Sequence, residues 1–326
     1  MIYWAKTSIM VKIIFKENEK YWSVFWNDCL IFVVFLYKCT KMASLDHTLL
    51  QQFIIDALHE DIHEGDHTSL ACIPADDRSN AKLLVKSEGV IAGVSIAEAI
   101  FKHVDPTAKL DIKIQDGEDV KYGDVAFYVE CNSQALLKAE RLILNTMQRL
   151  SGIATLSSRF AFEVEGLPVK ILDTRKTTPL IRFLEKWAVK VGGCENYRIG
   201  LYDWIMIKDN HVDACGSHTE AITKVHEYLK NNNLDLGITV EVRNLVELQE
   251  VLNKGGVTRI MFDNFELPIL AEAVAHVDGR FETEASGGIT LQSVRKVALT
   301  GVDYISAGAL THSAGCLDLS LKVVKD

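Results

Sequence analysis

Four cationic side chains lie near one another in the sequence, each shortly after an apolar run or in the loop that connects two such runs. They are Arg175, Lys176, Arg198 and Lys208. In parallel α/β folds, ligands bind where the loops leave the carboxyl ends of the strands. One such cation alone would be typical of a surface salt bridge. Four in this order favour a site for a ligand that carries several negative charges.

Two carboxylates end apolar runs further along the chain: Glu241 in ITVEV and Asp263 in RIMFD. Carboxylates that share an edge with cations are suited to hold Mg²⁺ and the hydroxyl groups of a sugar. The alternative is that they only neutralise the lysines and arginines around them. The two interpretations are compatible with each other.

Glycine-rich turns follow the last two apolar runs, at Ser286-Gly287-Gly288 and at Ala307-Gly308. Glycine lets the backbone come close to an anion, and a helix that begins there offers free N–H groups. A pair of such turns in the last two strand–helix units of a barrel is a common phosphate site. We therefore expect a phosphate group at these turns.

These residues need a framework of alternating strands and helices, which the sequence provides from about residue 168 onward. Six segments have the pattern of strands: VKILDT, DWIMIKD, ITVEV, RIMFDN, FETEASGG and VDYISAGAL. Helical patterns fall between them, at 179–190, 217–231, 244–254, 266–275 and 290–299. Six such units predict a parallel sheet that closes, or nearly closes, into a barrel. With six or seven strands instead of eight, the α/β barrel would be open on one side.

The chain divides into three parts by pattern. Residues 42–150 predict an α+β domain, because alternating, turn-rich segments follow a first helix, and residues 151–326 predict the barrel, its last residues packing back on the N-terminal domain. A helix over 136–160 carries Arg141. Residues 1–41 have a different composition. Their apolar run is too short to span a bilayer, so we interpret them as a mis-called start, with a membrane-surface or targeting segment as the alternative.

Composition excludes some functions. The chain of 326 residues has a net charge of −9, and its first 41 residues are basic, so the remainder is more acidic still. Nucleic-acid binding requires a basic face, and a membrane span requires a long apolar helix, so neither partner is expected. The seven cysteines are scattered without metal-binding spacing. A reducing, cytoplasmic location is the simplest interpretation.

The motifs TRKTTP, EKWAV, GGxxNYR and IKDNH, in this order, resemble the quinolinate phosphoribosyltransferase family, also called nicotinate-nucleotide pyrophosphorylase. The resemblance covers the chain from Leu45 to the C-terminus. It implies an open α/β barrel with an N-terminal α+β sandwich domain. It also implies that quinolinate and phosphoribosyl diphosphate react with Mg²⁺ to give nicotinate mononucleotide, CO₂ and diphosphate.

The resemblance also implies roles for individual residues. Catalysis would involve Lys208, Glu241 and Asp263, and the last two would hold Mg²⁺. Arg141 lies in an AERxxLN element that, in the family, reaches the neighbouring subunit's site, so the enzyme would be at least a homodimer. The implied substrate contacts are Arg141, Thr174, Arg175, Lys176, Tyr197, Arg198, Lys208, Glu241, Asp263, Ser286, Gly287, Gly288, Ala307 and Gly308.

Three positions depart from the family pattern. Tyr197 stands where the family usually has His, Thr239 where it often has Glu, and Leu180-Ile181 where a Gly-Gly pair is commoner. A tyrosine is not cationic at neutral pH, so quinolinate binding could be weaker or the substrate different. The alternatives are a same-fold phosphoribosyltransferase for another anion, a non-catalytic phosphometabolite-binding barrel, and a Schiff-base aldolase that uses Lys176 or Lys208.

Overall fold

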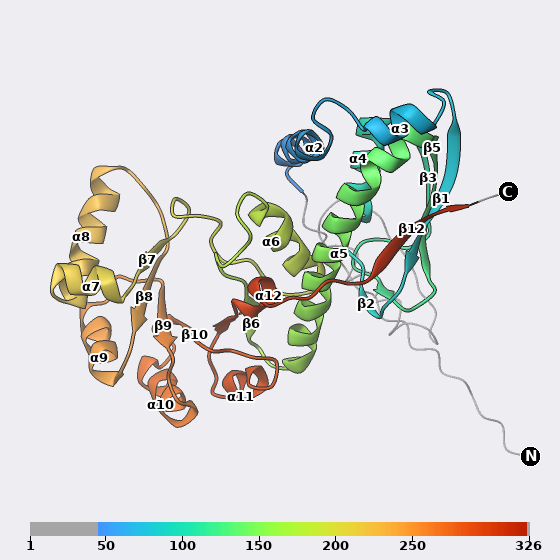
Figure 1. Ribbon diagram of the computed structural model, residues 1–326. Helices are drawn as coiled ribbons and strands as arrows, with labels where there is room; N and C mark the ends of the chain where they lie inside the picture. The colour runs from blue at the N-terminus through green and yellow to red at the C-terminus, as the bar shows by residue number, and fades with distance from the viewer. Residues whose placement is uncertain (1–44, 325–326) are drawn as a thin grey trace, which may run out of the picture. The chain divides into compact units, whose positions relative to one another are not determined.

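The computed structural model describes residues 45–324, which form part of one compact unit, residues 44–326. The N-terminal extension, with its proposed mis-called start, lies outside the described residues. Two sheets organise the described chain, one antiparallel and one parallel (Figure 1). Among residues 45–324, no helix is both long and apolar enough to cross a membrane.

The antiparallel sheet has the strand order β12-β1-β5-β3, formed by Leu319–Val324, Arg78–Val85, Val125–Asn132 and Lys109–Ile112. Strand β1 alternates between exposed and buried side chains, as expected for a sheet with one face on a core. A two-stranded ribbon, β2 (Gly89–Val90) with β4 (Asp119–Val120), adjoins it. Helices α2 (His47–Ile62), α3 (His67–Cys72) and α4 (Val94–Val104) complete this part.

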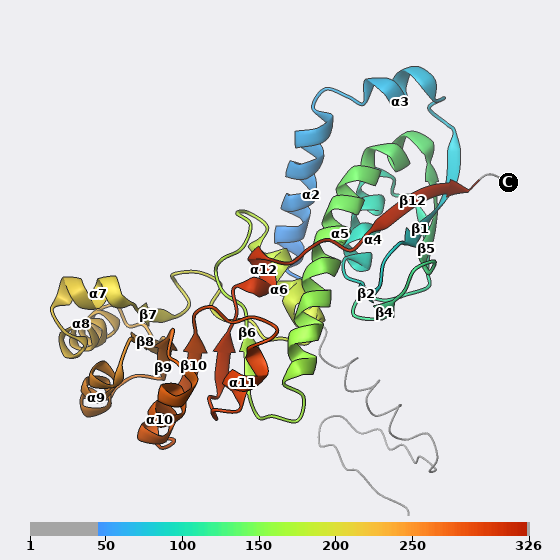
Figure 2. The same cartoon turned by 60° about the horizontal axis from the view of Figure 1, so that its bottom comes forward.

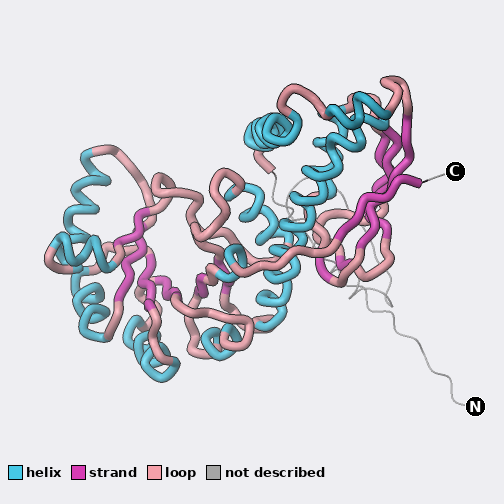
Figure 3. The backbone as a smooth tube through the Cα atoms, viewed as in Figure 1, coloured by secondary structure: helices cyan, strands magenta, loops and turns pink. Residues whose placement is uncertain are grey.

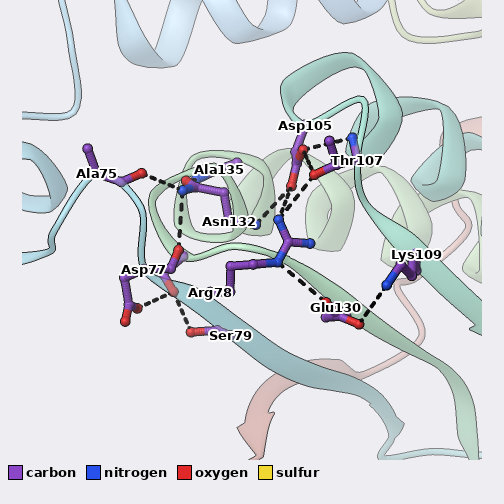
Figure 4. Close-up of polar contacts among 11 residues, drawn as sticks. Ala75, Asp77, Arg78, Ser79, Asp105, Thr107, Lys109, Glu130, Asn132 and Ala135 are labelled. Carbon is purple, nitrogen blue, oxygen red and sulfur yellow. Dashed lines mark hydrogen bonds and ion pairs between the residues drawn. The ribbon is translucent and has the colours of Figure 1, made fainter.

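A polar cluster fastens the start of β1 to the end of β5 (Figure 4). The Asn132 side-chain amide donates to the carbonyl oxygens of Ala75 (2.8 Å) and Asp77 (3.2 Å), and Asn132 Oδ1 accepts from Ala135 N (3.0 Å). Asn132 is thus the N-cap of the next helix, α5 (Ser133–Glu163). The cluster fixes the direction in which α5 leaves the sheet.

Helix α5 contacts both parts of the chain, since it packs against α4 and β2 and also against α6 (Arg182–Val191) and α11 (Val294–Ala298). It runs unbroken past residues 150 and 151, where we placed the domain boundary. Position 152 of this helix requires glycine, because the backbone of Gly315 passes very close to it. A Cβ atom at Gly152 would lie 1.8 Å from the carbonyl oxygen of Gly315. The long helix connects the α+β part to the barrel without a linker.

The parallel sheet is an open barrel, as the sequence predicted. Its order is β6-β11-β10-β9-β8-β7. Strands β6 and β7 are consecutive in the chain but lie at opposite edges, so the barrel is open between them. Helices cover the outer face of the strands (Figures 2 and 3). The strands are Lys170–Leu172, Ile205–Ile207, Ile238–Val242, Arg259–Asp263, Glu282–Ser286 and Tyr304–Ser306, for β6 to β11 in order.

Most expected helices of the barrel are present as α6, α8 (His218–Asn231), α9 (Leu245–Lys254) and α10 (Leu267–Val277). The helix expected at 290–299 is confined to α11. Two short helices were not predicted, α7 (Asp209–Cys215) and α12 (Ala309–His312). Each begins directly after a strand, where the sequence indicated only a polar loop or a turn.

Candidate active site

Apart from Arg141, the predicted site residues lie at or near the carboxyl ends of the six parallel strands, which we call the rim. Thr174, Arg175 and Lys176 follow β6, and Lys208 follows β7. The turns at Gly287 and Gly308 follow β10 and β11. Because all six strands are parallel, their carboxyl ends meet at one end of the barrel. The topology therefore brings together residues that are up to 134 positions apart in the sequence.

Two arginines of the rim are close enough to influence each other. Burial and the nearby Arg175 cation lower the pKa of Arg198 below its usual range. Arg175 Nε is buried and has no hydrogen-bond partner among the described residues. Buried polar groups are nearly always hydrogen-bonded, so an unpaired guanidinium nitrogen beside a second arginine favours an anionic ligand at this position.

Lys176 is directed toward the turn after β11. Its stem crosses Gly308 so closely that a Cβ atom at Gly308 would meet Lys176 Cδ at 3.0 Å. The backbone carbonyl of Lys176 accepts a hydrogen bond from Thr311 Oγ1 (2.8 Å). Lys176 therefore belongs to the same corner of the rim as the expected phosphate turn.

The two carboxylates lie on neighbouring strands and on one face. Glu241 of β8 pairs with Met261 of β9, and Asp263 lies two residues beyond Met261, so both carboxylates face the same side. Glu241 is 7% exposed and forms an ion pair with Lys208. Asp263 accepts a hydrogen bond from Asn264 Nδ2 (2.9 Å). The site thus contains one carboxylate in an ion pair, that of Glu241, and one that is more exposed to solvent, that of Asp263.

The turn after β10 requires glycine. Gly287 has a φ of 98°, and a Cβ atom there would meet Asn264 Oδ1 at 2.2 Å. The backbone N–H of Asn264 also donates to the carbonyl of Ser286 (2.9 Å). The end of β9, which carries Asp263, is therefore packed against the expected phosphate turn.

Arg141 is not among the rim residues within this chain. It lies on α5 with an exposed side chain, and no hydrogen bond or ion pair to the rim joins it within the described residues. The structure of one chain therefore leaves Arg141 directed to solvent.

A buried ion pair supports the rim from below. Asp173, directly after β6, and Lys186 of α6 are 0% and 1% exposed and contact each other. Burial raises the pKa of Asp173 to about 6, although Lys186 opposes this, and burial lowers the pKa of Lys186. The same two side chains hold the backbone of Tyr197, whose N–H donates to Asp173 (2.8 Å) and whose carbonyl accepts from Lys186 (3.2 Å).

A second charged pair joins α5 to the TRKTTP loop. Arg149 donates to Glu185 of α6 (3.0 and 2.9 Å) and to the carbonyls of Thr311 and Ala314. Glu185, 0% exposed, accepts from the backbone and the hydroxyl of Thr178 (3.0 and 2.8 Å). The EKWAV motif therefore supplies two buried charged residues that fix the loop carrying Arg175 and Lys176.

The residue that follows the TRKTTP motif has a left-handed backbone conformation, although it is not the glycine that is commoner in the family. Leu180 has a φ of 68° and is 95% exposed. For a bulky residue this backbone conformation is strained. Arg182 stabilises the loop, because its guanidinium donates to Thr177 Oγ1 (2.9 Å) and to the carbonyl of Ile199 (3.0 Å).

Below the rim, the two other departures from the family pattern contact each other. The hydroxyl groups of Tyr197 and Thr239 are 2.6 Å apart. Burial and the nearby Glu284 raise the pKa of Tyr197, so the phenol stays neutral. Arg259, buried beneath, donates to Glu284 (3.1 Å) and to Glu282. The Tyr197 hydroxyl is already hydrogen-bonded to Thr239. We therefore assign Tyr197 to the floor below the rim and not to the cationic side chains that can bind a substrate.

Sequence reasoning gave no role to this polar floor or to the buried ion pairs: Arg149, Asp173, Glu185, Lys186, Arg259 and Glu284. A signal for two of them existed. Arg259 begins the apolar segment RIMFD, and Glu284 lies in the middle of FETEASGG, which we also interpreted as a strand. A charge at a buried strand position requires a partner, which indicates an internal polar network.

The fold and the rim together define a class: α/β-barrel enzymes that bind small anionic substrates at the carboxyl ends of the strands. Comparison with known proteins narrows this class. Residues 66–151 match the N-terminal domain of quinolinate phosphoribosyl transferase, and residues 153–322 match its C-terminal domain. The chain therefore belongs to the quinolinate phosphoribosyltransferase family.

Individual relatives agree with this assignment. The chain is 46% identical over 282 residues to quinolinate phosphoribosyltransferase (decarboxylating) 1b of Nicotiana tabacum, covering 82% of this chain and 80% of that protein. Identity and coverage are the same for the chloroplastic nicotinate-nucleotide pyrophosphorylase (carboxylating) of Arabidopsis thaliana. The crystal structure of NadC from Streptococcus pyogenes is similar, with a TM-score of 0.81, 33% identity and coverage of 87% of this chain and 100% of that one.

Proposed function

We propose that the rim is the site at which this chain transfers the phosphoribosyl group of phosphoribosyl diphosphate to quinolinate, with loss of CO₂, to give nicotinate mononucleotide and diphosphate. The reaction is that of the family and makes the chain a pentosyltransferase. The observation that supports the location is the buried, unpaired Arg175 Nε beside Arg198.

Quinolinate carries two carboxylates, which suit the arginine side of the rim. The planar guanidinium binds a carboxylate through two parallel hydrogen bonds, which a lysine cannot do. Arg175 and Arg198 are close to each other, and Lys208 lies at the end of the next strand. Several cations are needed because moving one ion out of water costs several kcal/mol, which a single hydrogen bond does not offset.

Phosphoribosyl diphosphate suits the other side of the rim. Lys176 lies across Gly308, and the turn at Gly287 is packed on the end of β9. We assign the 5′-phosphate to the turns at Ser286-Gly287-Gly288 and Ala307-Gly308. Lys176 then lies on the side of the ribose and the diphosphate, and we also assign Thr174, whose hydroxyl accepts from Lys176 N (3.0 Å), to substrate binding.

The donor set fits Mg²⁺ held jointly with a substrate. Within residues 45–324, no group of three or more His, Cys, Asp or Glu side chains could hold a metal ion. Mg²⁺ is commonly bound by one or two carboxylates together with substrate phosphates. Glu241 and Asp263 would hold it, and it would neutralise the departing diphosphate.

The remaining chemistry is electrostatic. When the quinolinate nitrogen attacks the anomeric carbon, positive charge develops on the ribose, and Glu241 or Asp263 can stabilise it. Loss of the 2-carboxylate leaves a carbanion beside the ring nitrogen. We assign the stabilisation of this charge to the ammonium of Lys208, which forms an ion pair with Glu241, or to Arg198, until a proton from solvent replaces the lost carboxylate.

The Mg²⁺ assignment predicts that Asp263→Asn raises the Mg²⁺ concentration needed for half-maximal activity by about tenfold, because an amide is a weaker ligand than a carboxylate. Removal of Mg²⁺ with a chelator should abolish product formation by the wild-type chain, and added Mg²⁺ should restore it. The measurement is nicotinate mononucleotide formed from quinolinate and phosphoribosyl diphosphate across a Mg²⁺ titration.

Two controls accompany this titration. Glu272→Gln removes an exposed carboxylate of α10 and should leave the Mg²⁺ dependence unchanged. Nicotinate in place of quinolinate should give no product. An unchanged Mg²⁺ dependence of Asp263→Asn would contradict the assignment of Asp263 to the metal.

We propose that two chains complete each other's sites, as a homodimer or larger assembly, with Arg141 entering the neighbour's rim. The exposed side chain of Arg141, free of an ion pair within the described residues, supports this.

The cytoplasm is the proposed location, in keeping with the five described cysteines, which are all free.

The shared site predicts complementation between two inactive variants. Arg141→Ala and Lys208→Ala should each be nearly inactive, and after subunit exchange the mixture should regain about a quarter of wild-type activity. Half of the dimers are then hybrid, and each hybrid has one intact site. The measurement is activity before and after exchange, with exchange verified by differently tagged chains. No recovery in verified hybrids would contradict a shared site.

A further inference from the structure

The side chain of Thr239 connects both ends of the loop that carries Arg198. Thr239 lies on β8 and is 0% exposed. Its hydroxyl is 2.6 Å from the hydroxyl of Tyr197 and accepts a hydrogen bond from Trp204 Nε1 at 2.9 Å. Tyr197 and Trp204 directly flank residues 198–203. The hydroxyl group of Thr239 is thus hydrogen-bonded to both residues that flank this loop.

The aromatic rings at the two ends are also held from below. The guanidinium carbon of Arg259 lies 5.2 Å from the ring centre of Tyr197 and 5.8 Å from that of Trp204. Both distances are within the range of cation–π attraction. Arg259 is itself fixed by Glu284 and Glu282. The two rings that contact Thr239 therefore both lie against an arginine that is held by two glutamates.

Arg198 is linked to the held end of the loop. Its Nη1 donates to the backbone carbonyl of Trp204 (3.1 Å). Within the loop, Asp203 accepts from the N–H groups of Ile199 (2.7 Å) and Gly200 (2.9 Å). A shift of Trp204 would move the carbonyl that holds the guanidinium, so the position of Arg198 depends on the indole.

The loop needs this support because it lies where the barrel is open. Strands β6 and β7 are not paired with each other, and residues 198–203 between them belong to no strand. The pairing that comes before them is an isolated bridge between Glu195 and Leu172 of β6. On the β6 side, Asp173 and Lys186 hold the backbone of Tyr197. At the other end, Trp204 is held through its indole. The next residue, Ile205, pairs with Ile238 of β8, and Thr239 of the same strand adds a side-chain contact to the indole.

We propose that Thr239 is a positioning residue for substrate binding: by fastening Tyr197 and Trp204, its hydroxyl sets the place of Arg198 at the rim. This inference rests on the proposed role of Arg198 in binding quinolinate. It also accounts for two departures from the family pattern at once. Tyr197 and Thr239, which stand where the family usually has His and Glu, form a contacting pair and act together.

The test compares Thr239→Val, which keeps the shape but removes the hydroxyl, with Thr239→Ser, which keeps the hydroxyl. In the full chain, Thr239→Val should raise the KM for quinolinate about fivefold to tenfold, as expected for lost hydrogen bonds, and leave the KM for phosphoribosyl diphosphate within about twofold. Thr239→Ser should restore the wild-type value. Thr223→Val, which removes a hydroxyl bonded within α8, is the matched control and should change neither KM.

A double-mutant cycle shows whether Thr239 acts through Arg198. In an Arg198→Gln background, Thr239→Val should raise the KM for quinolinate by less than about twofold further, because the residue it positions is gone. A full, additive effect in that background would overturn the inference and leave the site assignment intact. If Arg198→Gln alone leaves the KM for quinolinate unchanged, the assignment of Arg198 fails, and the inference fails with it.

A spectroscopic readout is independent of activity. In a ¹⁵N-labelled chain, the indole N–H resonance of Trp204, assigned from its absence in Trp204→Phe, should move upfield in Thr239→Val and stay in place in Thr239→Ser. Tyr197→Phe serves as the second variant should Thr239→Val not fold, and it should raise the KM for quinolinate by a smaller factor. An unshifted Trp204 resonance in folded Thr239→Val, or an unchanged KM in Tyr197→Phe, would overturn the proposal.

Discussion

Lys186→Met is expected to lower the free energy of unfolding by about 3–5 kcal/mol. Lys186 and Asp173 are almost completely buried and pair with each other. Removing the ammonium leaves the Asp173 carboxylate in the interior without its countercharge, which costs more than the ion pair contributes as a pair. Urea unfolding of the full chain measures the loss.

The pH dependence of this variant distinguishes a buried charge from lost packing. Burial raises the pKa of Asp173 to about 6 even beside Lys186, so without Lys186 the pKa must rise further. The folded state then binds a proton that the unfolded state, with its ordinary pKa, does not bind at the same pH. Stability therefore rises as the pH falls through the folded pKa, and the deficit should be smaller at about pH 5 than at about pH 8.

A second substitution provides the control for charge. In Lys186→Met/Asp173→Asn the buried charge is absent, so roughly half of the lost stability should return at neutral pH. An equal deficit in the single and double variants, with no dependence on pH, would show that Lys186 acts by filling space only.

Arg175→Gln is expected to lower kcat/KM for quinolinate by about 30- to 700-fold, equivalent to about 2–4 kcal/mol. Its Nε is buried and has no hydrogen-bond partner among the described residues, so this nitrogen can donate to a substrate carboxylate. Glutamine keeps a polar side chain but removes the charge and the two-pronged geometry. Steady-state kinetics with quinolinate as the varied substrate give the ratio.

Two further variants define what Arg175 does. Lys176→Gln, at the adjacent position, should raise the KM for phosphoribosyl diphosphate instead, because Lys176 lies against Gly308. Arg295→Gln removes a cation whose Nη1 donates to the carbonyl of Glu163, away from the rim, and should affect neither substrate. Should Arg175→Gln raise only the KM for phosphoribosyl diphosphate, the two sides of the rim would have to be exchanged.

The framework of the barrel was predictable because its signals are local. Short runs rich in Ile, Val and Phe alternate with helical periods, and each run ends near a polar residue that the parallel topology brings to one edge. The number of strands predicted a barrel open on one side, but only the strand order of the structure locates the opening between β6 and β7. The short helix α7 was missed because Asp209 and its neighbours read as a polar loop, and its seven residues are too few for a clear period.

The support beneath the rim was not predictable, since it depends on which distant positions meet. Nothing in the sequence places Asp173 beside Lys186, or Tyr197 against Thr239, without the register of the strands. The departures at Tyr197 and Thr239 were visible in the sequence as separate substitutions. The structure shows that these two residues contact each other through their hydroxyl groups.

The pairing of β12 with β1 affects how the chain is made. Strand β1 spans Arg78–Val85, and its partner β12 is the last described strand, Leu319–Val324. During synthesis the ribosome must release almost the whole barrel before β1 gains this neighbour, and until then one of its edges is open to other chains. The N-terminal sheet, although it emerges first, is thus completed last, and a nascent or prematurely terminated chain would carry an exposed strand edge.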